Sequence, residues 1–273
     1  MTELKDKIEA YIEIAVKASL KAGDEILKIY GTDDFNIEKK KDDSPLTLAD
    51  KKAHEIIMEY LKETDIPVLS EEGKGINYEE RKNWALMWLV DPIDGTKEFI
   101  KRNGEFTVNI ALIREGTPIA GVIYVPVNKD LYFANCLSSD SYKSENISIK
   151  DIDNNLSAFK AKSDKLPLVD ETDVYTVVGS RSHMNNDTRE FIEELKKEHK
   201  EIDIMSRGSS LKICMIAEGR ADVYPRFAPT MEWDTGAGHA IAVAAGKTVL
   251  QKESRKPLVY NKEDLLNPHF IIE

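Results

Sequence analysis

The stretch from Trp88 to Thr96 (Trp-Leu-Val-Asp-Pro-Ile-Asp-Gly-Thr) constrains the fold more than any other part of the chain. The apolar residues that lead into it predict the end of a buried strand. Pro92 cannot donate to a sheet ladder, so we expect the strand to stop there. Asp91 and Asp94 would then share a tight turn. The sequence therefore predicts two fixed carboxylates at the point where a strand leaves its sheet.

Two carboxylates on one turn favour a metal site. Acidic oxygens held close together repel each other unless a cation lies between them, and hard oxygen ligands in a cramped turn suit Mg²⁺. Gly95 allows backbone N–H groups to approach an anion, and a helix that starts after Thr96 would add its dipole. Because Asp, Pro and Gly are also ordinary turn residues, a plain Asp-rich turn is the alternative. An EF-hand loop is excluded, since it needs acids at alternate positions.

Composition limits the partners of the chain. Its 273 residues allow one large domain or two of ordinary size, and its net charge of −11 argues against bulk binding to nucleic acid or an anionic membrane. Cys136 and Cys214 are far apart in sequence, which predicts no disulfide partner and a reducing compartment. The N-terminus lacks the basic region and apolar run of a signal peptide. We expect a cytoplasmic protein. Loose association with the inner membrane, and the choice between monomer and homodimer, stay open.

Hydrophobic periodicity predicts two regions. Residues 1–155 form an α+β domain, with a long amphipathic helix over about 4–30 and a later antiparallel meander. Residues 156–273 alternate strands with helices, which is typical of an α/β domain that would complete the site. The polar, weakly patterned residues 138–172 are interpreted as the junction.

Further acids lie where elements are expected to begin or end. Asp50 follows Thr47 by three residues at the start of a helix, which resembles a capping box. Glu71 and Glu72 follow a short strand, and adjacent carboxylates in a strand would point to opposite sides, so only one of them would face the site. Asp234 begins the last long helix, where an acid complements the helix dipole or caps the helix. For Asp50 and Asp234 both interpretations remain open.

Polar residues of the second region could bind an anion. Ser209 and Ser210, with Lys212 after them, place hydroxyls and N–H groups at a helix start, and a plain N-cap is the alternative. His183 lies on a polar loop, where a surface histidine is more common than a ligand. A carboxylate cage with two metals suits phosphoryl transfer, because the metals lower the pKa of water and clamp the attacking and leaving oxygens.

Three motifs together resemble the inositol monophosphatase superfamily of Mg²⁺-dependent, lithium-sensitive phosphatases. They are Ser70-Glu71-Glu72, the stretch from Asp91 to Thr96, and Trp233-Asp234. Longer matches narrow the resemblance to the bacterial 3′(2′),5′-bisphosphate nucleotidases; they cover residues 94–109, 179–183, 208–212 and 221–226. The inositol enzymes typically have Thr-Asn-Phe where this chain has Lys97-Glu98-Phe99.

The resemblance implies a layered α/β/α/β/α sandwich and two or three Mg²⁺ ions per site. The implied metal ligands are Glu71, Asp91, Asp94, Asp234 and the carbonyl of Ile93. The implied catalytic residues are Asp50 and Thr96, which would orient or deprotonate the attacking water, and Glu72, which would support the ligands. Gly95 and Thr96 would hold the phosphate through N–H groups. The nucleotide end would be bound by His183, Ser209, Lys212 and Arg226. Substrate contacts would also include Glu71, Ile93, Asp94 and Asp234.

The activity implied by this resemblance is in-line attack of water on the 3′-phosphate of adenosine 3′,5′-bisphosphate, which yields AMP and phosphate. Two alternatives remain. One is a phosphatase of the same fold that acts on inositol or sugar phosphates. The other is a catalytically silent nucleotide-binding sensor, although carboxylates buried without a metal would be costly.

Overall fold

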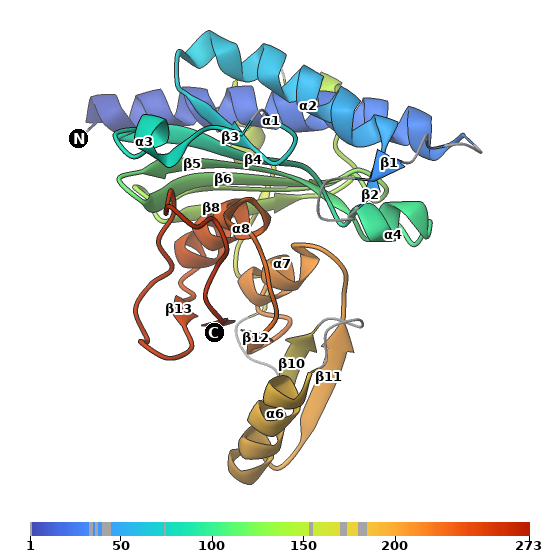
Figure 1. The fold of residues 1–273 in the computed structure, drawn as a ribbon, viewed down its shortest axis with the longest axis vertical. Coiled ribbons are helices and arrows are strands. Elements are labelled where there is room, and N and C mark those ends of the chain that lie inside the picture. Colours follow the sequence, from blue (N-terminus) through green and yellow to red (C-terminus); the bar gives the residue numbers. More distant parts are fainter. Residues whose placement is uncertain are drawn as a thin grey trace.

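The protein is layered. A computed structural model describes residues 2–32, 35, 38–39, 45–73, 75–152, 155–169, 174–179 and 185–273. From one side to the other lie two long helices, a seven-stranded sheet, a second pair of helices, a smaller set of strands and an outer helix (Figure 1). This is the expected α/β/α/β/α arrangement, and that prediction is confirmed.

The seven-stranded sheet forms the centre of the molecule. Its strands follow the order β3-β4-β5-β6-β7-β8-β9, with β3 parallel to β4 and the other neighbours antiparallel. The strands span β3 (Val68–Ser70), β4 (Leu86–Asp94), β5 (Thr107–Arg114), β6 (Thr117–Val125), β7 (Asp130–Asn135), β8 (Asp140–Ser144) and β9 (Asp164–Lys165). The predicted meander therefore forms, and it continues for two strands beyond the expected end.

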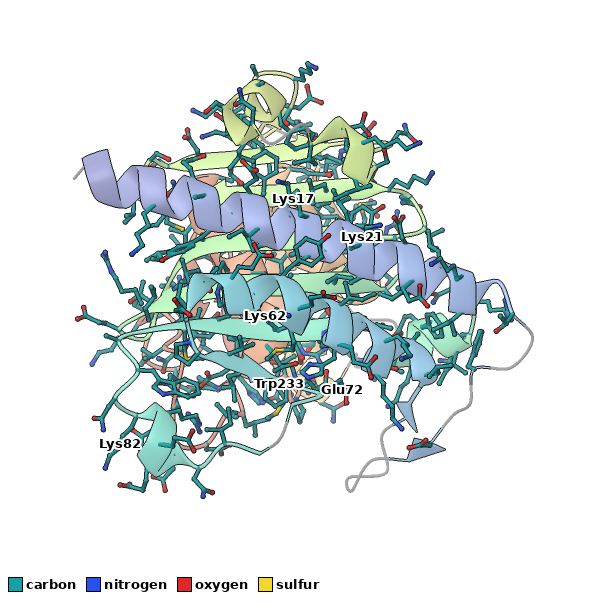
Figure 2. The ribbon with its side chains drawn as sticks, turned by 90° about the horizontal axis from the view of Figure 1, so that it is seen from above. Lys17, Lys21, Lys62, Glu72, Lys82 and Trp233 are labelled. Atoms are coloured by element: carbon teal, nitrogen blue, oxygen red, sulfur yellow. The ribbon has the colours of Figure 1, made fainter. Side chains whose placement is uncertain are left out.

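Two helices, α1 (Thr2–Tyr30) and α2 (Leu48–Leu61), cover one face of this sheet (Figure 2). The apolar side of α1, which includes Ile12 and Val16, is buried in one cluster with Trp88 of β4. Burial of such side chains stabilises the fold by about 1.5–3 kcal/mol each. The long predicted helix over 4–30 is thus confirmed.

The opposite face of the sheet is covered by α7 (Leu211–Ala217) and α8 (Glu232–Ala244). Their contact with the strands is close because small residues meet there. A Cβ placed on Gly121 of β6 would lie 2.3 Å from the carbonyl oxygen of Ala237 on α8. A Cβ on Gly236 would likewise lie 2.9 Å from a methyl carbon of Leu89. The small residues of α8 therefore bring its first turns directly against the middle of β4, β5 and β6.

A second set of strands lies beyond α7 and α8. The parallel pair β10 (Tyr175–Gly179) and β11 (Ile202–Ser206) is joined through a Val177–Val223 bridge to the sheet β12-β14-β13. The outer helix α6 (Asn186–Glu198) packs on it through a small core that includes Ile192 and Phe227. The remaining elements are β12 (Tyr224–Arg226), β13 (Val249–Gln251), β14 (Phe270–Ile272), β1 (Glu38–Lys39), β2 (Pro45–Leu46), η1 (Lys62–Thr64), α3 (Tyr78–Arg81), α4 (Thr96–Ile100), η2 (Ile149–Asp151) and α5 (Leu156–Lys160).

The central strand does not stop at Pro92, and the prediction that it would is wrong. Its pairing with β5 shifts register between Asp91 and Asp94, and Asp94 pairs again with Thr107. Pro92 is tolerated because it lies in this irregular segment, where no ladder hydrogen bond is required of it. The two aspartates are therefore presented by an irregularity within the strand.

Residues 138–172, interpreted as the junction, do contain regular secondary structure. They contain β8, α5 and β9, and both strands extend the first sheet. Short strands with polar side chains at an edge leave little periodicity in the sequence. Sheet membership places residues 156–165 with the first region, beyond the expected boundary at 155. The division into two domains stays a prediction.

Within the part of the chain that the structure describes, no helix has the length and apolar character needed to span a bilayer. Cys136 and Cys214 are both free thiols in this structure.

Candidate phosphoryl-transfer site

Three aspartates converge where the two regions meet. Asp91, Asp94 and Asp234 each offer a carboxylate oxygen within 4.8 Å of the others. The first two come from the irregular end of β4, and the third comes from the first turn of α8. The backbone N–H of Ile93 donates to Asp91 Oδ1 at 3.0 Å, which fixes the shape of this segment.

Glu71 joins this group because β3 runs parallel to β4. Its backbone N–H donates to the carbonyl of Val90 at 3.1 Å, which places it beside Asp91. Glu71 and Glu72 lie in the turn after β3 and not in the strand itself. The argument that strand geometry would turn them to opposite sides therefore does not apply.

The electrostatics of the cluster are unfavourable for bare carboxylates. Burial raises the pKa of Asp91 well above its usual range, and the charges of Glu71, Asp94 and Asp234 raise it further. Burial, followed by the charge of Asp94, does the same to the pKa of Asp234. Burial also raises the pKa of Asp94, although the Ser209 hydroxyl and the charge of Lys212 oppose the shift. This crowded set of hard oxygen donors fits a divalent cation, whose charge would offset the repulsion.

Next to the cluster, Gly95 is the N-cap of the short helix α4 and has a φ of 93°. This left-handed conformation favours glycine, and a Cβ there would lie 3.2 Å from the carbonyl oxygen of Glu105. The following residue, Thr96, directs its hydroxyl toward Asp50 Oδ1 at 3.2 Å. An oxygen that donates to Asp50 keeps its lone pairs for another donor.

Asp50 acts both as a cap and as a partner of Thr96. Its Oδ2 accepts from the backbone N–H of Thr47 at 2.8 Å and from the Thr47 hydroxyl, so the capping box is present. Its Oδ1 accepts from Thr96. Asp234 combines two contacts in the same way, because its Oδ2 accepts from the backbone N–H of Met231 at 2.9 Å while the side chain faces the acidic cluster.

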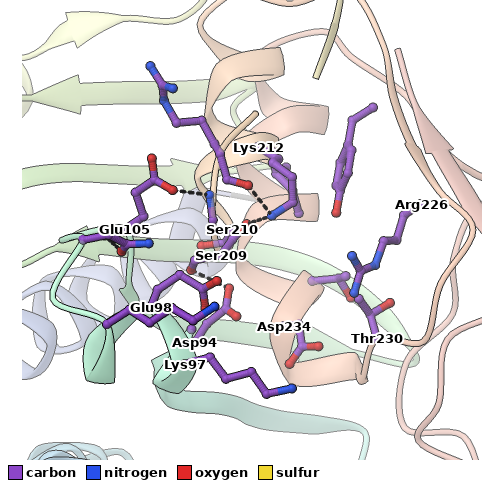
Figure 3. Close-up of a pocket in the computed structure, with 18 of the residues that line it drawn as sticks. Asp94, Lys97, Glu98, Glu105, Ser209, Ser210, Lys212, Arg226, Thr230 and Asp234 are labelled. Atoms are coloured by element: carbon purple, nitrogen blue, oxygen red, sulfur yellow. Dashed lines mark hydrogen bonds between the residues drawn. The ribbon is translucent and has the colours of Figure 1, made fainter. Parts of the chain in front are cut away.

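Asp94 and Asp234 lie along one side of a pocket with a volume of about 560 Å³ (Figure 3). Lys212 and Arg226 line it together with Asp94 and Asp234. The Lys212 ammonium donates to the carbonyls of Ser209 and Arg207, and burial lowers its pKa to about 8. The Arg226 guanidinium donates to a backbone carbonyl through one nitrogen at 2.8 Å. The pocket thus combines carboxylates with cations, and Lys97 lies on the same side as the two aspartates (Figure 3).

Hydrogen bonds of hydroxyl groups connect the two sides of the pocket. Ser209 Oγ donates to Asp94 Oδ2 at 2.7 Å and lies 2.7 Å from Thr107 Oγ1. Ser210 Oγ donates to Asn109 Oδ1 at 3.0 Å. Sequence reasoning did not single out Thr107 and Asn109 as individual residues. The available signal was their position two residues apart on β5, where polar side chains interrupt an otherwise apolar strand.

The family model for the inositol monophosphatase family matches residues 7–270. The chain belongs to the inositol monophosphatase family. Its curated relatives include the 3′(2′),5′-bisphosphate nucleotidase CysQ of Salmonella typhimurium, which is 45% identical over 262 residues and covers 95% of this chain and 98% of that protein. The corresponding CysQ of Escherichia coli is 47% identical over 253 residues, covering 91% and 94%.

Solved structures of the inositol monophosphatase family agree. The crystal structure of CysQ from Bacteroides thetaiotaomicron has a TM-score of 0.90 and 54% identity, and the match covers 97% of each chain. A Staphylococcus aureus inositol monophosphatase described as bound to 2′AMP has a TM-score of 0.71 at 21% identity, covering 96% of this chain and 88% of that one. The second likeness supports the fold alone.

The structure brings most of the expected site residues together, while their roles stay predictions. Those that lie in or beside the pocket and the acidic cluster are Asp50, Glu71, Asp91, Ile93, Asp94, Gly95, Thr96, Ser209, Lys212, Arg226 and Asp234. Glu72 is half-buried in the turn beside Glu71. His183 lies outside the described residues.

Proposed function

We propose that the protein is a Mg²⁺-dependent 3′(2′),5′-bisphosphate nucleotidase that hydrolyses adenosine 3′,5′-bisphosphate to AMP and phosphate. The observation that carries this proposal is the two-sided pocket. Asp94 and Asp234 lie on one side, and Lys212 and Arg226 lie on another (Figure 3). A substrate with two phosphates needs both, since one phosphate must meet the metals and the other needs cations of the protein.

The metal ligands in this proposal are Glu71, Asp91, Asp94 and Asp234, together with the carbonyl of Ile93. The crowding of these acids and the raised pKa values of Asp91 and Asp234 fit hard divalent cations, and Mg²⁺ is the one that the family resemblance favours. When bound, such ions supply a water of lowered pKa and neutralise charge on the transferring phosphoryl group.

The remaining chemistry is assigned to side chains of the chain. Thr96 takes a proton from the attacking water and passes its own hydroxyl proton to Asp50 Oδ1, while Asp50 Oδ2 keeps its hydrogen bond from the backbone N–H of Thr47. The N–H groups of Gly95 and Thr96 face the phosphate. Ser209 orients Asp94 through its hydroxyl. Lys212 and Arg226 bind the phosphate that is not hydrolysed, which fixes the nucleotide before attack.

Phosphate release from a small panel of substrates tests this proposal. We expect kcat/KM for adenosine 3′,5′-bisphosphate to exceed that for adenosine 3′-monophosphate by about tenfold or more, the scale of a hydrogen bond to a charged group. Inositol 1-phosphate should be poorer still. Equal rates on the inositol ester would favour an inositol or sugar phosphatase, and binding of nucleotides without phosphate release would favour the silent sensor. The panel is run in MgCl₂ and again after chelation, which should abolish activity.

A further inference from the structure

A hydrogen bond joins two loops at the rim of the pocket that are far apart in sequence. The backbone N–H of Gly208 donates to Glu105 Oε2 at 2.9 Å (Figure 3). Glu105 lies between α4 and β5, whereas Gly208 precedes α7. We call this contact the Glu105–Gly208 bridge.

The two loops pack without a gap at this bridge. A Cβ on Gly208 would lie 2.9 Å from the backbone oxygen of Glu105 and 2.9 Å from Cγ of Glu98. No side chain fits there unless the backbone moves, so glycine is required by the close approach and not by its own dihedral angles. The two loops are therefore in van der Waals contact at the bridge. A contact over a longer distance could not take the place of this hydrogen bond.

Glu105 itself is held in a fixed loop. Arg102 and Gly104 both have positive φ values, 56° and 76°, which turn the chain sharply. The backbone N–H of Glu105 donates to Asn103 Oδ1 at 2.9 Å. The carboxylate is thus presented toward Gly208 by a turn that has few other conformations open to it.

The bridge anchors the turn that carries the cationic side of the pocket. Immediately after Gly208, Ser209 adopts a left-handed conformation with a φ of 53°. The carbonyls of Arg207 and Ser209, on either side of Gly208, accept from the ammonium of Lys212. A shift of Gly208 would move both carbonyls and with them the ammonium. The hydroxyl of Ser209, by contrast, has its own link to Asp94.

Charge gives a second reason to assign Glu105 a role. Glu98 and Glu105 both line the pocket that, on the proposed function, receives a bisphosphate. Carboxylates in such a place repel an anionic substrate. Glu105 offsets this disadvantage if its carboxylate organises a cation that the second phosphate needs.

We propose that Glu105 is a positioning residue for substrate specificity: through Gly208 it places Lys212 to meet the phosphate that is not hydrolysed. This inference rests on the proposed function. It predicts that loss of the bridge weakens binding of the second phosphate and leaves the chemistry at the first one intact.

The test compares substrates with and without the second phosphate. Glu105→Asp keeps the charge but withdraws the acceptor by one methylene, and Glu105→Ala removes it. In both, we expect KM for adenosine 3′,5′-bisphosphate to rise by about tenfold or more, with kcat within about twofold. The kcat/KM for adenosine 3′-monophosphate should stay within about threefold. The amide oxygen of Glu105→Gln still accepts from an N–H, so this variant should show only a small part of the rise in KM.

Glu98→Gln is the matched control, because it removes a negative charge from the same pocket and leaves the bridge intact. It should keep or increase the preference for the bisphosphate. Melting temperatures are measured for every variant. If the wild type shows no preference for the bisphosphate, the proposed function fails. If the wild type shows it and Glu105→Asp or Glu105→Ala keeps it, the inference is overturned. Equal losses on both substrates would overturn it as well, since they indicate general misfolding of the site.

Discussion

Two regions of the molecule each bring an aspartate, one buried and one half-buried, to the site from the third residue of a helix. Asp50 comes from α2 and Asp234 from α8, and each accepts a hydrogen bond from the backbone N–H that precedes its helix. Around Asp50 the neighbours are donors from Thr47 and Thr96. Around Asp234 they are other acids, and its pKa is raised.

This difference shows that a helix cap and a functional acid are not alternatives. The capping bond uses one oxygen in both cases, and the surroundings of the other oxygen decide what the residue can do. Where that oxygen meets a hydroxyl, the acid suits proton transfer. Where it meets more carboxylates, it suits a cation.

The largest effect is expected when one acid of the carboxylate cluster is replaced. Asp234→Asn should lower kcat by about a thousandfold or more, because a divalent ion contributes several kcal/mol of transition-state stabilisation. The melting temperature without metal should not fall, since one repelling charge is removed. Asp91→Asn should behave in the same way. Steady-state kinetics in MgCl₂ and thermal melts in chelator measure both quantities. Turnover near that of the wild type would refute the ligand assignment.

A smaller effect is expected from changes at Asp50, the acid that is surrounded by hydrogen-bond donors. Asp50→Asn and Thr96→Val should each lower kcat by about a hundredfold, the scale of general acid–base catalysis. The double variant should cost little more than either change, because residues that act as a unit are not additive. Thr96→Ser keeps the hydroxyl and is the matched control. Thr47→Ala measures the cap by itself, as a loss of about 1 kcal/mol in stability. If the losses in kcat of the two single variants multiply in the double variant, Asp50 acts only as a helix cap.

The smallest effect concerns pH. Since the pKa values of Asp91 and Asp234 are raised in the folded state, the metal-free fold binds more protons than the unfolded chain. Its stability should therefore fall as pH rises from about 4 through the raised pKa values. Metal binding requires the ionised form, so the gain in melting temperature on adding MgCl₂ should be several degrees larger at about pH 8 than at about pH 5.5.

Asp91→Asn is the control for this measurement, because it removes the residue in which burial and neighbouring charges combine. Its metal-free melting temperature should depend less on pH, and MgCl₂ should shift it little. A wild-type shift that is independent of pH would contradict the assignment of the crowded acids as the source of the effect.

Local signals predicted much of this from the sequence. The capping box at Thr47, the helix over 4–30 and the strand leading to Asp91 depend on neighbours in the chain, and all three formed. The irregular pairing around Pro92 could not be predicted, because it depends on the partner strand β5. The approach of Gly208 to Glu105 depends on the packing of elements about a hundred residues apart, and no local pattern reports it.

The packing of α8 on the central sheet has a consequence for folding during protein synthesis. Gly121 of β6 lies directly against Ala237 of α8, which comes much later in the chain. This face of the sheet is therefore covered completely only after α7 and α8 have both been synthesised, so folding depends on contacts between distant parts of the chain. Asp234 arrives with that helix. We expect the nascent chain to acquire its metal only after α8 has docked, so that the helix that covers the sheet is also the one that completes the acidic cluster.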